Sequence, residues 1–182
     1  MNELSRRVAA AEVLVTHPQP TFVPDVDNRF LVSPEDFVAR IPAWWDVSRV
    51  EQELASYNLC LPVAGDGLLN YAIGWNQPVG WRNWVLAMTA VSAAGEIVKS
   101  GAQVTKSVAG FEIHKFVVGS RDAFLFPVDY SLRVVPLGRR PKPSEPGSAE
   151  PELSESELRI LLDLKGLFDP TRKLNPGVFG AF

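Results

Sequence analysis

The middle of the chain limits the possible folds more than any other part of the sequence. Residues 84–91 are apolar and favour a strand, residues 94–95 suit a turn, and residues 96–99 continue as a second short strand. Residues 123–128 and 131–135 are rich in aromatic and β-branched side chains, which favour two further strands. The middle of the chain is therefore predicted to form an antiparallel sheet that begins with a hairpin.

Helical patterns lie on both sides of this region. Apolar residues recur at helical spacing in several segments, and Ser154 with Glu157 matches a capping box ahead of an apolar run. The expected helices are residues 2–15, a short helix that starts at Ser33 and ends before Pro42, residues 46–57, residues 111–118 and residues 154–166. The predicted fold class is α+β, an antiparallel-rich sheet with flanking helices.

Composition and charge exclude several classes of function. The 182 residues carry 18 basic and 21 acidic side chains, which argues against a nucleic-acid partner because such proteins present a basic face. No apolar run is long enough for a membrane span, and the N-terminus lacks the apolar segment of a secretory signal. The single cysteine, Cys60, excludes an internal disulfide and has apolar neighbours that favour a buried position. We expect a cytoplasmic protein.

Searches for common catalytic and binding motifs find little. The sequence has no G-x-x-x-x-G-K-[ST] phosphate loop, no G-x-G-x-x-G and no G-x-S-x-G nucleophile elbow. His17 and His114 have no nearby cluster of ligands, so we expect no metal site and assign no catalytic residue. The tryptophans are expected in the core or at a subunit contact rather than stacked on a ligand. They are Trp44, Trp45, Trp75, Trp81 and Trp84.

Two groups of short motifs, taken in order, point to a family. The first group starts with G-W-R-N-W-V-L at Gly80, continues through A-G-E and S-G-A-Q-V-T-K-S-V-A-G-F-E-I-H-K, and ends with G-S at Gly119 and L-R-V-V-P-L at Leu132. The second group is L-K-G-L-F-D-P from Leu164 and L-N-P-G from Leu174. Together they resemble the second half of the FAD-binding domain of the FAD-linked oxidases, the vanillyl-alcohol oxidase and p-cresol methylhydroxylase superfamily. The likeness is closest to the small FAD-domain subunit of bacterial glycolate oxidase.

The resemblance implies a fold, a cofactor and a set of binding residues. It implies the second FAD-binding subdomain of these oxidases, FAD as the cofactor, and a role as one component of an oxidoreductase. The cofactor-binding residues that it implies are Gly80, Arg82, Lys106, Ser107, Gly110, Gly119 and Ser120. Structural interpretations stay open for the same positions: Gly110 as a turn, Lys106 as a solvated strand end, and Arg82 as the partner of a carboxylate. His114 is expected to pack or hydrogen-bond on a helix.

The sequence also departs from the family pattern. No glycine-rich phosphate loop precedes Val63, and Asp66 stands in the second glycine-rich segment, where a carboxylate near phosphates is electrostatically unfavourable. Asp122 and Leu125 replace glycines that let the backbone approach the cofactor, so their side chains are expected to crowd that approach. The alternative hypothesis is a non-catalytic structural or regulatory paralogue that has lost FAD binding and acts through protein–protein contacts.

The chain divides into three expected parts. Residues 1–138 form the FAD-linked-oxidase-like α+β domain, which lacks the first phosphate-loop subdomain of the family. Residues 139–153 combine prolines with serine, glycine and glutamate, a composition typical of a linker, where the family has its substrate cap. Residues 154–182 form a C-terminal helix and tail. The expected partner is another protein subunit or a second copy of the chain.

Overall fold

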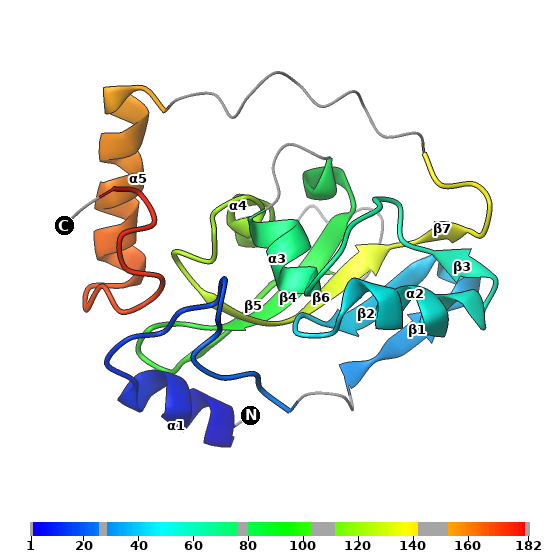
Figure 1. The fold of residues 1–182 in the computed structure, drawn as a ribbon, viewed down its shortest axis with the longest axis horizontal. Coiled ribbons are helices and arrows are strands. Elements are labelled where there is room, and N and C mark those ends of the chain that lie inside the picture. The colour runs from blue at the N-terminus through cyan, green and yellow to red at the C-terminus, as the bar shows by residue number, and fades with distance from the viewer. Residues whose placement is uncertain (1, 26–28, 76–79, 103–111, 142–152, 181–182) are drawn as a thin grey trace.

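Strand β6, Phe126–Arg133, lies at the centre of the main sheet. The computed structural model describes residues 2–25, 29–75, 80–102, 112–141 and 153–180. Within these residues, five antiparallel strands follow the order β1-β2-β6-β4-β5 (Figure 1). The other strands are β1 Leu31–Ser33, β2 Val38–Pro42, β4 Val85–Val91 and β5 Ile97–Gly101, and a separate pair joins β3 Leu59–Cys60 to β7 Val135–Pro136. The predicted α+β class with an antiparallel sheet is confirmed.

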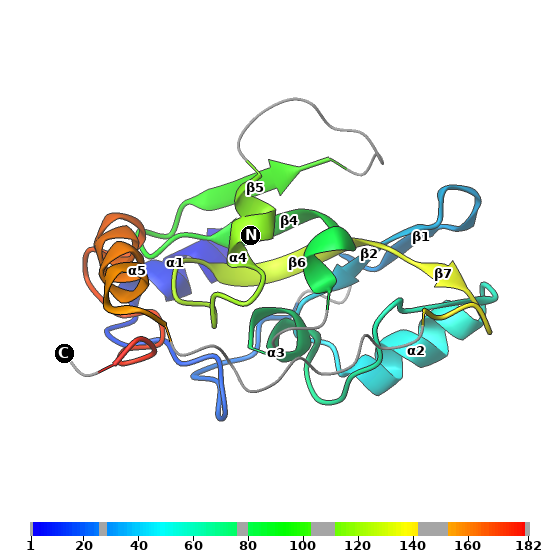
Figure 2. The ribbon, with the colours of Figure 1, turned by 90° about the horizontal axis from the view of Figure 1, so that it is seen from above.

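Helices cover one face of this sheet. The α-helices are α1 Asn2–Ala10, α2 Val47–Ala55, α3 Leu69–Gly74, α4 Ile113–Val117 and α5 Glu155–Phe168. Figure 2 shows α2 and α3 side by side beneath the sheet, with α1 and α5 at the end near the β4–β5 turn. Side chains of β6 alternate: Val128 and Tyr130 point into the core on the helical face, and Asp129 points to the opposite face. None of the helices in the described ranges is long and apolar enough to cross a membrane.

Most expected elements form with shifted ends. The predicted hairpin is confirmed as β4 and β5, and the helix expected at residues 46–57 is α2, capped by Asp46. The capping box of Ser154 and Glu157 is also confirmed, at the start of α5. The strands expected at residues 123–128 and 131–135 are instead one continuous strand, β6, followed by the short β7.

The segment after Ser33 differs from the expected helix. It makes a single 3-10 turn, η2, Pro34–Asp36, and then strand β2. The turn ends because Phe37 adopts a left-handed conformation with a φ of 53°. The next residues pair with β6 and place Ala39 and Ile41 in the core. This prediction was wrong beyond the first turn, because tertiary pairing outweighs a local helix-start signal.

The Lys165 ammonium group fastens α5 to the rest of the chain. Its Nζ donates to the Ala123 carbonyl oxygen at 2.6 Å, to Asp169 Oδ2 at 2.7 Å, and to the carbonyl oxygen of Leu174. Asp169 Oδ2 also accepts from the Leu174 amide at 2.7 Å. The K-x-x-F-D-P-x-x-x-L-N-P-G motif thus forms a buried network in which Lys165 uses all three of its donors.

Asn175, from the same motif, ties the tail to two other segments. Its Nδ2 donates to Thr16 Oγ1 at 2.8 Å and to the Arg121 carbonyl oxygen at 2.9 Å. Its Oδ1 accepts from the Thr16 amide at 2.7 Å. The motif therefore has a structural consequence: Asn175 joins the N-terminal segment, the loop after α4 and the C-terminal tail.

Replacing Lys165 with alanine should lower the free energy of unfolding by about 3 kcal/mol or more, because it leaves the buried Asp169 carboxylate without its cation. The matched control is Arg159→Ala on the exposed side of α5, which should change stability by less than about 0.5 kcal/mol. Urea denaturation measures both variants. Equal stabilities of the two variants would contradict the proposed fastening role.

Candidate functional site

Residues from four separate parts of the sequence line one pocket of about 540 Å³. Arg82, Gly119 and Ser120, all implied by the family resemblance, are among its lining residues. Gly80 is not among them, but it lies next to them at the start of the 3-10 turn η3, Trp81–Asn83, with a φ of 55°. The predictions for Lys106, Ser107 and Gly110 lie outside the described residues.

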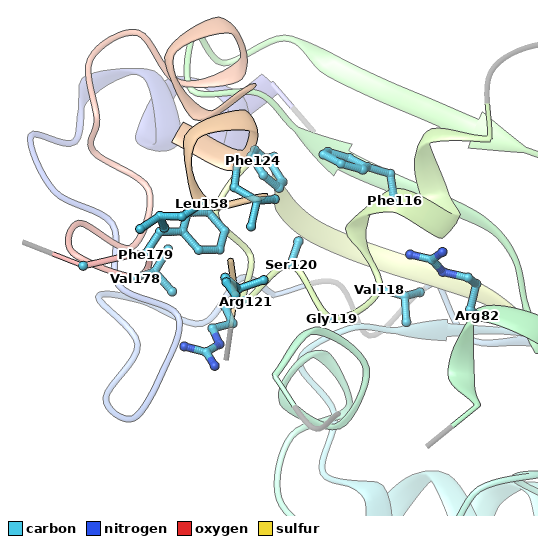
Figure 3. A pocket seen from close by; sticks show the side chains of 13 residues that line it. Arg82, Phe116, Val118, Gly119, Ser120, Arg121, Phe124, Leu158, Val178 and Phe179 are labelled. Carbon is cyan, nitrogen blue, oxygen red and sulfur yellow. The ribbon is translucent and has the colours of Figure 1, made fainter. Parts of the chain in front are cut away.

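The pocket lies between the loop that follows α4, the helix α5 and the C-terminal tail. Figure 3 shows Phe124, Leu158 and Phe179 gathered at one end of it and Arg82 at the other. The rings of Phe116 and Phe124 have centroids 4.7 Å apart, and those of Phe124 and Phe179 are 5.9 Å apart. These contacts make a wall of aromatic and aliphatic side chains, the kind of surface that binds a flat apolar group.

The charged residues of the pocket wall are both basic. Arg82 and Arg121 line it, and no carboxylate is found among its described lining residues. Guanidinium groups suit anions, phosphate above all, because their N–H groups match oxyanion geometry. The pocket therefore combines an apolar wall with a positive rim.

The resemblance implies two serines as cofactor-binding residues, and Ser120 is the one that the structure describes. It is buried at 6% exposure, and its Oγ has no hydrogen-bond partner among the residues that the structure describes. A buried hydroxyl without a partner is unfavourable, so this oxygen is available to a bound group. The neighbouring backbone amides are not: those of Gly119 and Arg121 donate to the carbonyl oxygens of Ile73 and Gly74 in α3, at 3.0 and 2.7 Å.

The pocket residues fit part of a flavin cofactor. The aromatic wall suits a ring system, and the Arg82 guanidinium with the Ser120 hydroxyl suits an anionic oxygen. The loop amides that could cradle a phosphate are instead bonded to α3. The described part of the chain thus supplies a wall and side-chain donors, and a complete cofactor site needs further groups.

Asp122 and Leu125 do not narrow this pocket. Neither is among its lining residues; Leu125 lies in the core, and the Asp122 side chain is fully buried against α3. Asn70 Nδ2 donates to Asp122 Oδ2 at 3.3 Å, and a Cβ on Gly74 would lie only 2.6 Å from Asp122 Oδ1. Gly74 is therefore required by the closeness of the carboxyl group.

Burial raises the pKa of Asp122 from its usual 3.8 to about 7. Thr16, Asn70 and Trp75 favour the charged form and lower the pKa by less. Burial also raises the pKa of Tyr130, whose hydroxyl has no hydrogen-bond partner and is near enough to Asp122 to feel its charge. The family pattern marks Asp122 as a substitution, but only the fold shows that it is an interior acid.

His114 behaves as expected for a packed residue. It lies in α4 at 4% exposure, with Nδ1 at 3.1 Å from Ser100 Oγ, and its backbone amide donates to the same oxygen at 3.2 Å. Burial lowers its pKa. The core position expected for the tryptophans is confirmed for Trp44, Trp45 and Trp81, and Cys60 is buried as predicted.

The residues missed by sequence analysis are mostly the pocket's aromatic wall. Phe124 and Phe179 carried no motif signal of their own, although Phe179 follows the L-N-P-G motif closely. Arg121 stands directly after the G-S pair and has a left-handed backbone with a φ of 56°. No group of His, Cys, Asp and Glu suitable for a metal ion occurs within the described ranges.

Comparison with known proteins gives one partial similarity. No protein-family model matches the chain. The chain is 38% identical over 55 residues to a D-lactate dehydrogenase of Anaerostipes hadrus. The matched segment is 30% of this chain and 12% of that dehydrogenase. The similarity is to part of an oxidoreductase, which is compatible with the class of protein that the motifs resemble.

Replacing Asp122 with asparagine should change how stability depends on pH. The folded-state pKa of about 7 exceeds the usual 3.8, so the unaltered chain loses stability as pH rises from about 4 to about 7. The variant lacks this loss, and at pH 8 its free energy of unfolding should exceed that of the unaltered chain by about 4 kcal/mol, because a shift of roughly three pKa units corresponds to about 1.4 kcal/mol per unit. Urea denaturation at pH 4.5 and pH 8 measures the difference. The control is Asp163→Asn on α5, and a pH dependence equal to that control would refute the assignment.

Proposed function

We propose that this chain is the FAD-binding-type component of an oxidoreductase resembling a glycolate oxidase subunit. The observation that carries the proposal is the pocket itself, where Arg82 and the Gly119-Ser120 pair come together from separate motifs. The resemblance implies that these residues bind the cofactor, and it rests on sequence motifs alone, not on their positions in space. The partial similarity to a D-lactate dehydrogenase supports the same class of chemistry.

Under this proposal the chain supplies only part of the cofactor site. Residues 1–138 are the FAD-linked-oxidase-like domain, residues 139–153 the linker, and residues 154–182 the C-terminal helix and tail. The pocket offers side-chain donors, while the amides of its loop already bind α3. Another subunit, or a second copy of the chain, therefore contributes the remaining phosphate-binding groups.

A non-catalytic structural or regulatory subunit is the second candidate, and the loop after α4 favours it. The amides of Gly119 and Arg121 are committed to α3, and the buried Asp122 carboxyl group sits behind them. Such a loop keeps its shape without a ligand. In this case the chain acts through protein–protein contacts and binds no FAD.

The two candidates differ in what purified protein does with FAD. A flavoprotein component should show flavin absorbance in the visible, or quench FAD fluorescence, when purified with the partner that its native cell supplies. Protein that stays colourless and leaves FAD fluorescence unchanged, alone and in its native complex, excludes the first candidate. A native complex without flavin supports the second.

Replacing Ser120 with alanine separates a ligand-binding role from a folding role. The variant should keep or gain stability, by up to about 1 kcal/mol, because the hydroxyl has no partner in the fold. Its FAD dissociation constant should rise by at least about fivefold, the loss of one hydrogen bond to a charged oxygen. Fluorescence titration of the FAD-binding form and urea denaturation measure the two effects.

The control for Ser120→Ala is Ser156→Ala, at an exposed position in α5. It should leave FAD affinity unchanged. If Ser120→Ala binds FAD as tightly as this control, Ser120 does not contact the cofactor.

A further inference from the structure

A second hollow lies on the other face of the sheet, away from the helices. It has a volume of about 170 Å³ and shares no lining residue with the larger pocket. Strand register places two rows of residues across it. One row is Arg40, Ser131, Ala87 and Gly101, and the other is Pro42, Asp129, Thr89 and Lys99. The side chains in the middle of both rows are small, and the space that they do not fill is the hollow.

Positive charge is in excess around this hollow. Arg40 holds Asp129 with two hydrogen bonds, Nε to Oδ1 at 3.0 Å and Nη2 to Oδ2 at 2.9 Å. Arg29 Nη1 donates to the same Oδ2 at 2.5 Å. Asp129 is 1% exposed, so one buried carboxylate serves two arginines. Lys99, at the hollow's edge on β5, forms no ion pair with a described carboxylate.

The two arginines keep donors to spare. A guanidinium carries five N–H groups, and Arg40 uses its Nε and Nη2 on Asp129 and Thr89, while Arg29 uses its Nη1 on Asp129. A single arginine would neutralise Asp129. The second is left without a carboxylate partner of its own among the described residues, and a partly buried positive charge is unfavourable unless an anion completes the group.

The geometry of the sheet lets a small ligand reach these donors. Neighbouring strands lie about 4.8 Å apart. Arg40 and Lys99 are separated by three strand spacings and by one row along the strands, so their Cα atoms are roughly 16 Å apart. Two long cationic side chains can close this distance around a ligand of a few atoms. The floor between them is made by Ala87 and Thr89 of β4, which leave the ligand space.

We propose that this hollow binds a small oxyanion, either the carboxylate of an organic acid or a phosphate group. Arg40 and Lys99 flank the anion, Thr89 offers a hydroxyl, and Asp129 holds the arginines in place. The proposal is independent of FAD binding, because the two pockets share no residue.

The test is a calorimetric titration of the full chain with D-lactate and, separately, with inorganic phosphate, against sodium chloride of equal ionic strength. Saturable binding of lactate identifies a carboxylate site, and saturable binding of phosphate identifies a phosphate site. If neither anion binds beyond the chloride reference, the proposal is wrong.

Two variants locate any binding. Lys99→Gln removes one flanking charge, and Ala87→Val fills the hollow without a change of charge; each should weaken binding by at least about fivefold. Arg159→Gln, on α5, removes a charge elsewhere and should leave affinity unchanged. Arg40 is left intact because it makes two of the hydrogen bonds to the buried Asp129, so its loss would also disturb the fold. If both Lys99→Gln and Ala87→Val bind like the control, the anion binds somewhere else and the assignment fails.

Discussion

The buried ammonium group of Lys165 is the interaction on which the C-terminal part of the structure depends. Helix α5 has an amphipathic pattern, yet Lys165 is its buried residue. Burying a cation is unfavourable unless its donors are satisfied, and here one carboxylate and two carbonyl oxygens satisfy them. Because one of those carbonyls belongs to Ala123, the helix is held against the loop that follows α4. The larger pocket exists because of this attachment, since α5 forms one of its walls.

The loop that follows α4 explains why side chains, rather than backbone amides, are available to a ligand in the pocket. Its backbone turns with left-handed conformations at Arg121 and Asp122, and its amides bond to the end of α3. Glycines at such positions would leave the backbone accessible, whereas Asp122 sends a carboxyl group into the interior and braces the loop from behind. The pocket therefore presents side chains such as Arg82 and Ser120, and the buried Ser120 hydroxyl has no hydrogen-bond partner among the described residues.

The sequence predicted the class of fold better than its connections. The hairpin, α2 and the capping box of α5 follow from local signals that tertiary contacts reinforce. The segment after Ser33 shows the limit, because pairing of β2 with β6 depends on residues far along the chain. Motifs identified Arg82 and Ser120, but not Phe179 or the hollow beside Arg40. Those features depend on which strands are neighbours, and no local pattern encodes that order.

The two pockets place different demands on the chain. The larger one is assembled from a loop, a helix and the tail, so it depends on the attachment of α5 at Lys165. The hollow on the opposite face is built from adjacent strands whose register is fixed by the core residues that alternate with it, such as Tyr130 and Leu132. A change that loosens α5 would then open the larger pocket and leave the hollow intact. Anion binding by a chain with a detached α5 would accordingly show that the sheet alone forms the second site.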